Sequence, residues 1–349
     1  MASIDLAKLA TIPYLDVANI GGRVITSLMF HDNGAWRSWI EAGDQLVEMH
    51  AWPAESVYFS KAEAAPYDIA FHFLDFMSQH ACVPQVMPAL LGIRDDYFNL
   101  SSSLAKIQHL HATRASVGNG CSRMVVAEVE YVFLVCRSIF DLLQEIALKL
   151  WDTIQLLDTS LKKKALRDSF NAMTRFEGKP ATRETLSRRF GLPSPLADYY
   201  VRWHGFFGLL RGFRDNVVHR GSQVQTIFTN ESGFLILKSL KPFQDMDVWR
   251  DDERLPNDLV PLMPALGVIV YKTLEACDDF SQTLSRIVQF PPPIVPGMRL
   301  FMRGYFNESL ASILRDADER LRHPAPSDMT ATEPKPEIRR PPSKHEPTN

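Results

Sequence analysis

Cysteine is scarce in this sequence, and its spacing excludes most cysteine chemistry. The four cysteines, Cys82, Cys121, Cys136 and Cys277, are widely separated, with no Cys-x-x-Cys pair and no histidine cluster at metal-ligand spacing. A disulfide framework and a structural zinc site are therefore not expected, and we predict neither a metal nor any other cofactor. Scattered, unpaired cysteines are typical of a protein that stays in a reducing compartment.

Long hydrophobic runs and an export signal are also missing. Glu128 and Glu130 interrupt one apolar stretch, Pro261 and Pro264 interrupt another, and none reaches the roughly 20 residues that a membrane span needs. The N-terminal residues lack the charged start and long apolar core of a signal peptide. We therefore expect a cytoplasmic protein with no membrane partner. The net charge of −3 points to no class of partner by itself.

Helical periodicity is the main pattern that is present. From Arg123 to about Leu157 there is no Gly or Pro, and apolar residues recur every three or four positions. Such a helix would be about 50 Å long. A second helix is expected from Leu196 to the residue before Gly221, and a third from Ala265 to Phe290. These patterns predict a mainly α fold, an antiparallel helical bundle with a small β-hairpin around "TNESG".

Composition divides the chain into four parts. Residues 1–94 form an N-terminal extension of mixed or helical structure, and residues 95–290 form the helical domain. Residues 291–322 form a C-terminal helix region. The tail, residues 323–349, is rich in Pro, Glu, Ser, Thr and Lys and is expected to be disordered.

The stretch "FRDNVVHRG", at the end of the second helix, carries the clearest candidate for chemistry. A histidine at a helix C-terminus is favoured in its protonated form, so His219 is suited to acid–base catalysis. Arg214 offers a planar fork of donors for phosphate oxygens, and Asp215 or Asn216 could orient the imidazole. The spacing alone proves little, because Arg340 and His345 in the tail repeat it. Helix capping is the alternative explanation.

Two further features surround this pair. Gly205, Gly208 and Gly212 fall on one side of the helix, which indicates either a closely approaching backbone or a helix weakened by chance. Residues 162–220 contain thirteen Lys or Arg and only five Asp or Glu, a surplus that suits a polyanion such as RNA or is a solvated face. The predicted RNA-binding residues are Lys162, Lys163, Lys164, Arg188, Arg189, Arg211 and Arg220.

The sequence resembles the HEPN domains (higher eukaryotes and prokaryotes nucleotide-binding), which are helical bundles with an R-x4-6-H motif. Arg214, the polar Asp215 and His219 match that motif. The segments "EYVFLVCRSIFDLLQEI", "KALRDSFNAM" and "GLPSPLADYY", with the hairpin after "HRG", look like one bacterial subgroup in order and spacing. The resemblance covers Asp95 to Phe290. Gly221 stands where some toxin members have a tyrosine, so close kinship with those toxins is in doubt.

The resemblance implies a metal-independent endoribonuclease, acting as a toxin or in antiviral defence. Arg214 would bind the scissile phosphate, and His219 would transfer a proton as the 2′-hydroxyl of RNA attacks the phosphorus. Asp141 on the long helix would support the pair, with Arg137 beside it. The resemblance also implies a homodimer with two motifs facing one cleft, and regulation by a partner protein. A non-catalytic protein that binds RNA, a nucleotide or another protein is the alternative.

Overall fold

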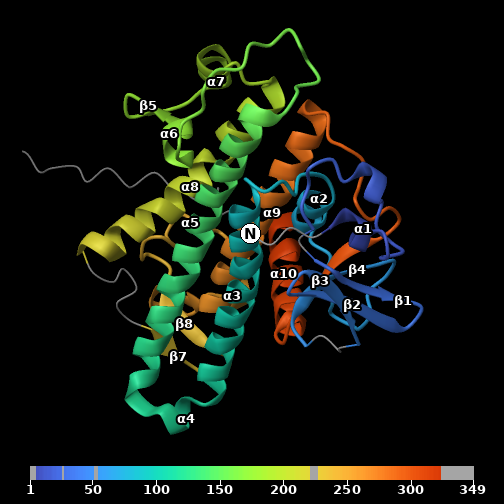
Figure 1. Cartoon of the computed structure of the whole chain (residues 1–349). Helices are drawn as coiled ribbons and strands as arrows, with labels where there is room; N and C mark the ends of the chain where they lie inside the picture. The colour runs from blue at the N-terminus through green and yellow to red at the C-terminus, as the bar shows by residue number, and fades with distance from the viewer. Residues whose placement is uncertain (1–4, 26, 51–53, 221–226, 324–349) are drawn as a thin grey trace, which may run out of the picture.

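The computed structural model describes residues 5–25, 27–50, 54–220 and 227–323, and for residues 214–220 it describes the helix but not the side chains. The fold is mixed α/β, with a five-stranded sheet beside a set of long helices (Figure 1). The prediction of a mainly α, all-helical bundle is therefore wrong. The difference lies mainly in the first sixty residues, which hold four of the five strands of the large sheet.

The large sheet combines both ends of the described chain. Its strand order is β10-β4-β1-β2-β3, and β1 runs parallel to β4 while the other neighbours are antiparallel. Asn33 and Gly34 join β1 to β2 with positive φ angles at both residues, as a tight type I′ hairpin turn requires. The strands are β1 (Met29–Asp32), β2 (Ala35–Ala42), β3 (Gln45–Met49), β4 (Ser56–Ser60) and β10 (Arg299–Arg303).

Ten α-helices make up most of the rest of the described chain. They are α1 (Leu6–Leu9), α2 (His72–His80), α3 (Met87–Ala112), α4 (Arg114–Val117), α5 (Cys121–Thr153), α6 (Phe170–Thr174), α7 (Arg183–Phe190), α8 (Ser194–Arg220), α9 (Leu262–Ile287) and α10 (Asn307–Arg322). The 3-10 turns are η1 (Val17–Asn19), η2 (Gly118–Gly120), η3 (Asp251–Glu253) and η4 (Pro256–Asp258). The long helices α3, α5, α8 and α9 lie side by side, with the large sheet next to α2 and α10 (Figure 1).

Two small sheets complete the fold. Strand β5 (Arg175–Phe176) pairs with β6 (Lys179–Pro180), between α6 and α7. The hairpin expected after the motif helix is formed by β7 (Phe228–Thr229) and β8 (Phe234–Leu237), and β9 (Leu259–Pro261) adds a third strand to it. The third strand was not expected, because it comes from a loop more than twenty residues further along the chain.

Helices α5 and α8 form an antiparallel pair that positions the motif helix. The ring of Phe133 on α5 stacks on Phe213 of α8, with 4.0 Å between the ring centroids. Further along, the Tyr200 hydroxyl donates a 2.7 Å hydrogen bond to Oε1 of Gln144. Both side chains are buried, so this bond replaces water for two polar groups and fixes the register of the helices.

The large sheet has apolar residues on both faces. One face, with Phe30 and Phe59, joins the main core. On the other, Trp36, Tyr58 and Phe301 form a small separate cluster. The guanidinium of Arg303 lies 4.7 Å from the centroid of the Trp36 ring.

Arg303 also forms a two-pronged ion pair with Asp68 under this cluster. Its Nε and Nη2 atoms bond the two carboxylate oxygens at 3.0 and 2.6 Å, and the two side chains are 9% and 4% exposed. The Tyr58 hydroxyl donates a further 2.6 Å bond to Oδ2 of Asp68. The cluster thus joins β10 to the loop that follows β4.

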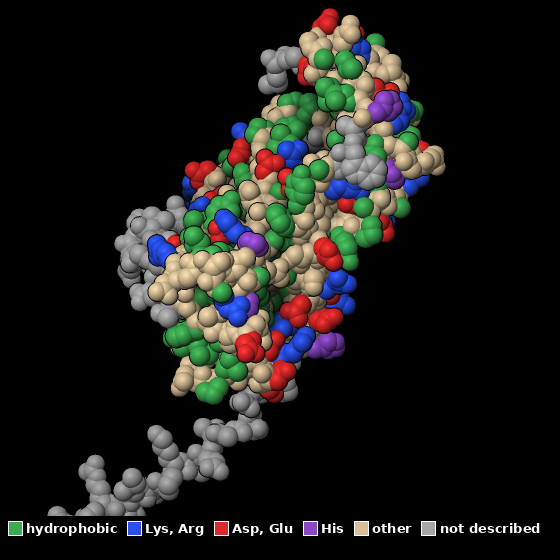
Figure 2. Space-filling model, turned by 90° about the horizontal axis from the view of Figure 1, so that it is seen from below, with side chains coloured by type: hydrophobic (Ala, Val, Ile, Leu, Met, Phe, Trp, Pro, Cys, Tyr) green, Lys and Arg blue, Asp and Glu red, His purple; other side chains and the backbone are tan. Residues whose placement is uncertain are grey.

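The four-part division stays a prediction, although its first boundary, between residues 94 and 95, falls inside α3. The tail from 324 to 349 lies outside the described residues, and His323 caps α10. No helix in the described part of the chain is both long and apolar enough to cross a membrane. Figure 2 shows acidic and basic side chains interspersed over the face of the molecule seen from below.

Candidate functional site

Helix α8 carries the R-x4-H motif, and its local sequence explains where it runs. Pro193 and Pro195 flank its first residue, Ser194, where missing amide hydrogens cost nothing. Its aromatic residues then face the core, the buried ones being Tyr199, Tyr200, Trp203, Phe207 and Phe213. The helix ends at Arg220, directly after His219 and before the predicted cap at Gly221. Gly221 itself lies outside the described residues.

Helical register places the two motif residues on different sides of α8. Arg214 and His219 both fall within the helix, and five residues turn an α-helix by about 140° beyond a full turn. Position 219 follows Gly212 by seven residues, which changes direction by only about 20°. Position 219 is therefore in line with the glycine row. The side chains of residues 214–220, with Asp215, Asn216 and Arg220 among them, lie outside the description, so their predicted roles stay predictions.

The glycine row of α8 is open. A Cβ atom added at Gly205, Gly208 or Gly212 would have no contact within 4 Å, apart from its own helix, with any described residue. The backbone that we expected to approach this side is absent from the described part of the chain. Each glycine costs about 1 kcal/mol relative to alanine in a helix. Packing against the described residues therefore does not explain the row.

Two cavities meet along this row. One, of about 380 Å³, lies between α8 and α6 and is lined by Asn171, Thr174, Arg175, His204, Gly205, Phe207, Gly208, Arg211 and Gly212. The other, of about 510 Å³, lies between α8 and the loop 241–245 and is lined by Gly205, Gly208, Leu209, Gly212, Phe213, Lys241, Pro242, Gln244 and Asp245. Because both share the three glycines, we name the combined feature, with these lining residues, the glycine groove.

The walls of the glycine groove are basic. Arg175 and Arg211 border the cavity on the α6 side, Lys241 borders the other, and Asp245 is the single carboxylate among the described lining residues. The guanidinium of Arg211 donates a hydrogen bond through Nη1 to Oδ1 of Asn171, which orients its planar fork. This arrangement suits an anion with several separated charges better than a cation.

His204 also lines the groove, and the surroundings lower its pKa. Partial burial disfavours the charged imidazolium, and the positive charge of Arg175 adds to the effect. His204 is partly exposed at the groove wall. A phosphate bound beside it would reverse the balance and favour protonation.

Several predicted RNA-binding residues make contacts within the fold. Lys163 donates through Nζ to the carbonyl oxygens of Trp151 and Ile154, at 2.6 and 2.7 Å, and so caps the end of α5. Lys164 bonds the carbonyl of Arg188 at the end of α7. Arg189 lies over the ring of Phe176, 4.5 Å from its centroid.

Other members of that predicted set differ in their surroundings. Lys162 and Arg188 have exposed side chains. Arg211 lines the glycine groove beside residues that were not predicted from the sequence. Arg175, His204 and Lys241 were not among the predicted RNA-binding residues, and the only sequence signal for them was the glycine row that they border.

Asp141, the predicted supporting residue on α5, forms an ion pair with Arg137 one turn earlier in the same helix. Its neighbour Phe140 packs against Phe206 and Phe207 of α8, whereas Asp141 lines a cavity with Glu145 and Asp168. The structure thus brings Arg137 and Asp141 together. The side chain of Arg214 lies outside the described residues, so the support of Arg214 and His219 by Asp141 stays a prediction.

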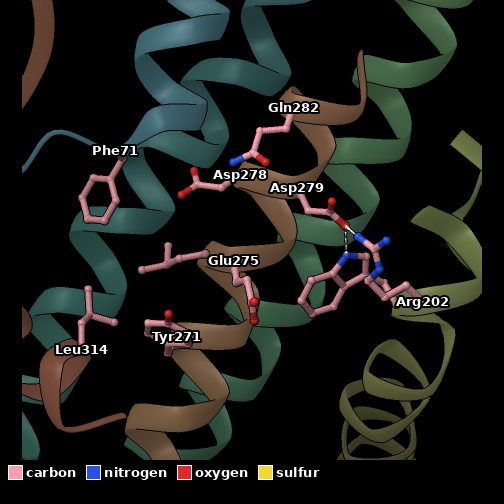
Figure 3. A pocket seen from close by; sticks show the side chains of 10 residues that line it. Phe71, Arg202, Tyr271, Glu275, Asp278, Asp279, Gln282 and Leu314 are labelled. Atoms are coloured by element: carbon pink, nitrogen blue, oxygen red, sulfur yellow. Dashed lines mark hydrogen bonds and ion pairs between the residues drawn. The ribbon is translucent and has the colours of Figure 1, made fainter. Parts of the chain in front are cut away.

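A further cavity, of about 380 Å³, lies on α9 and differs in character (Figure 3). Asp279 accepts 2.7 Å hydrogen bonds from Nη1 of Arg202 and Nε1 of Trp203, tying α9 to α8. Asp278 accepts a 2.9 Å bond from the backbone nitrogen of Phe73 in the first turn of α2. Burial raises the pKa of Asp278, and Glu275 adds a third carboxylate to the lining. This acidic cavity is unsuited to a polyanion, so the glycine groove is the candidate site for one.

Within the described residues, no group of three or more His, Cys, Asp or Glu side chains is arranged to hold a metal ion. All four cysteines are buried. No protein-family model matches the chain, and comparisons with curated proteins and with solved structures give no match either.

Proposed function

We propose that this protein is a metal-independent endoribonuclease of the HEPN type, with Arg214 and His219 as its active pair. The carrying observation is the position of His219 in line with an open glycine row whose walls bear Arg175, Arg211 and Lys241. A basic groove ending at a histidine offers both a track for a polyanion and a group that can move a proton.

In this reaction the RNA supplies its own nucleophile. His219 takes a proton from the 2′-hydroxyl, the oxygen attacks the adjacent phosphorus, and the bond to the 5′-oxygen breaks as that oxygen gains a proton. The products are a 2′,3′-cyclic phosphate and a 5′-hydroxyl. Arg214 stabilises the extra negative charge on the phosphate oxygens in the transition state. Because helix register separates the two positions by about 140°, pairing between motifs of two copies is part of the proposal.

The test is RNA cleavage by the purified protein in EDTA, beside His219→Ala and Arg214→Ala. The chain offers a matched control, since Arg340 and His345 have the same spacing. We expect cutting that both motif substitutions abolish and that His345→Ala leaves unchanged. Cutting that survives His219→Ala, with the protein folded, would contradict the assignment.

A binding protein without catalysis is the second candidate. It is favoured by one observation: Lys163, Lys164 and Arg189 are held by contacts inside the fold, so part of the basic segment has a structural use. This candidate predicts that RNA, a nucleotide or a protein binds without strand scission. The cleavage experiment, repeated with a binding measurement on the same RNA, separates the two.

A further inference from the structure

We propose that the glycine groove binds the sugar–phosphate backbone of single-stranded RNA and leads it to position 219. This inference rests on the proposed function, since it takes RNA as the ligand. It adds where the strand lies, which groups hold it and which form of RNA is accepted.

The basic walls indicate the chemistry of the occupant. Arg175 and Arg211 stand on one side of the α8 backbone and Lys241 on the other, so cations flank both cavities. Among the described residues of the lining, only Asp245 opposes them. A chain of phosphates complements two basic walls, whereas a helix from a second copy would need apolar walls to bury its side chains.

The floor explains how such a chain could approach. No Cβ atom projects from Gly205, Gly208 or Gly212, and no described residue outside the helix lies within 4 Å of where one would stand. Riboses and phosphates can therefore lie directly against the helix backbone. The row points along α8 toward position 219, so a strand following it reaches the proposed proton-transfer residue.

The shape and lining favour a single strand read without regard to sequence. Cavities of about 380 and 510 Å³ are nucleotide-sized, so we expect them to take a single strand in preference to the bulkier duplex. Phe207 and Phe213 in the lining are buried, so His204 is the one partly exposed aromatic ring among the described lining residues. Binding through phosphates alone positions a strand but does not specify its bases.

The proposal predicts how strongly the association constant for RNA depends on salt concentration. If Arg175, Arg211 and Lys241 each neutralise one phosphate, the logarithm of the association constant should fall with the logarithm of salt concentration at a slope of about −2. Removing one of these charges should reduce the slope by about 0.7.

The experiment is fluorescence anisotropy with a labelled single-stranded RNA of about twelve nucleotides, within the range that one single-strand site covers. All variants carry His219→Ala, so that the RNA stays intact, and EDTA is present. Gly208→Leu fills the groove floor, and Lys241→Ala and Arg175→Ala remove wall charges. Arg286→Ala, an exposed charge on α9 outside the groove, is the matched control. Melting temperatures and light scattering confirm folding and mass.

We expect Gly208→Leu to weaken binding at least tenfold, and each wall substitution to weaken it several-fold with the smaller slope. Arg286→Ala should leave binding unchanged, and the duplex of the same sequence should bind at least tenfold more weakly. Equal affinity for Gly208→Leu and the parent, with both folded, would overturn the proposal. The proposal would also be overturned if Gly208→Leu changed the oligomeric mass and left RNA binding unchanged, because the groove would then be an interface between copies.

The two proposals fail in different ways. If the protein with an intact motif binds RNA in the groove but never cuts it, the proposed nuclease activity is refuted and the proposed RNA binding in the groove stands. Cleavage that needs His219 but proceeds normally in Gly208→Leu would refute the groove and leave the nuclease.

Discussion

Replacing Gly208, which lies in the middle of α8, by alanine should stabilise this protein. The added methyl group has no contact within 4 Å with any described residue beyond its own helix, so no steric cost is expected. Alanine is favoured over glycine inside a helix by about 1 kcal/mol, mainly because glycine loses more backbone freedom on folding. The free energy of unfolding should therefore rise by about 1 kcal/mol.

Gly267 on α9 provides the contrast. An added Cβ there would lie 2.9 Å from Cγ2 of Ile313 on α10, where the two helices pack. The Ile313 side chain or one of the two helices must shift to relieve this contact, so Gly267→Ala should lose the gain in helix propensity and destabilise the protein. The pair of substitutions makes the same chemical change in an open site and in a closed one.

Urea denaturation at pH 7, followed by far-UV circular dichroism, measures both effects. The midpoint should move up for Gly208→Ala and down for Gly267→Ala, with unchanged slopes. Destabilisation of Gly208→Ala by 0.5 kcal/mol or more would refute the reasoning, because it would mean that something occupies the glycine groove in solution. If that destabilisation depended on protein concentration, the occupant would be a second copy.

Three further predictions concern buried or groove-lining charges. Asp68→Ala removes the carboxylate that forms an ion pair with the buried guanidinium of Arg303 and should cost about 3–5 kcal/mol in urea denaturation; a loss below about 1 kcal/mol would show that the ion pair is not formed. Burial alone would raise the pKa of Glu253, but hydrogen bonds from Arg320 hold it below its usual range. Its contribution to stability is therefore complete above the unfolded pKa of about 4.3 and is lost as pH falls through the lower folded value. The stability difference between the parent and Glu253→Gln should shrink over that window, and a difference independent of pH would contradict the argument. Finally, NMR titration should show the pKa of His204 below that of an unperturbed histidine and rising when RNA binds; no rise in the presence of saturating RNA would count against phosphates in the groove.

The helices could be predicted from the sequence, and the large sheet could have been recognised in part. The uninterrupted apolar period from Arg123 predicted α5, which runs from Cys121 to Thr153. The turn Asn33–Gly34 between β1 and β2 is the strongest short hairpin signal in the first sixty residues, and it predicts the pairing of these two strands. The pairing of β10 with β4 had no local signal, because its partners lie far apart in the chain.

The candidate site divides in the same way. The glycine row of α8 follows from helical spacing, and so does the alignment of position 219 with it. Arg175 and Lys241, in contrast, enter the groove from segments on either side of α8 in the chain, and only the packed fold places them there. A row of glycines predicts the close approach of another group, but only the residues of the groove walls indicate the chemistry of that group.

The late arrival of β10 has a consequence for biosynthesis. About 240 residues separate β4 from the strand that covers its free edge, and at 5–20 residues per second a ribosome needs roughly 10–50 s to make them. During that time β4 is an edge strand, and Asp68 has not met the guanidinium of Arg303. The first sixty residues can form their hairpins early, but the sheet becomes complete only when most of the polypeptide has been made. A chain that stops before residue 299 therefore cannot complete the large sheet.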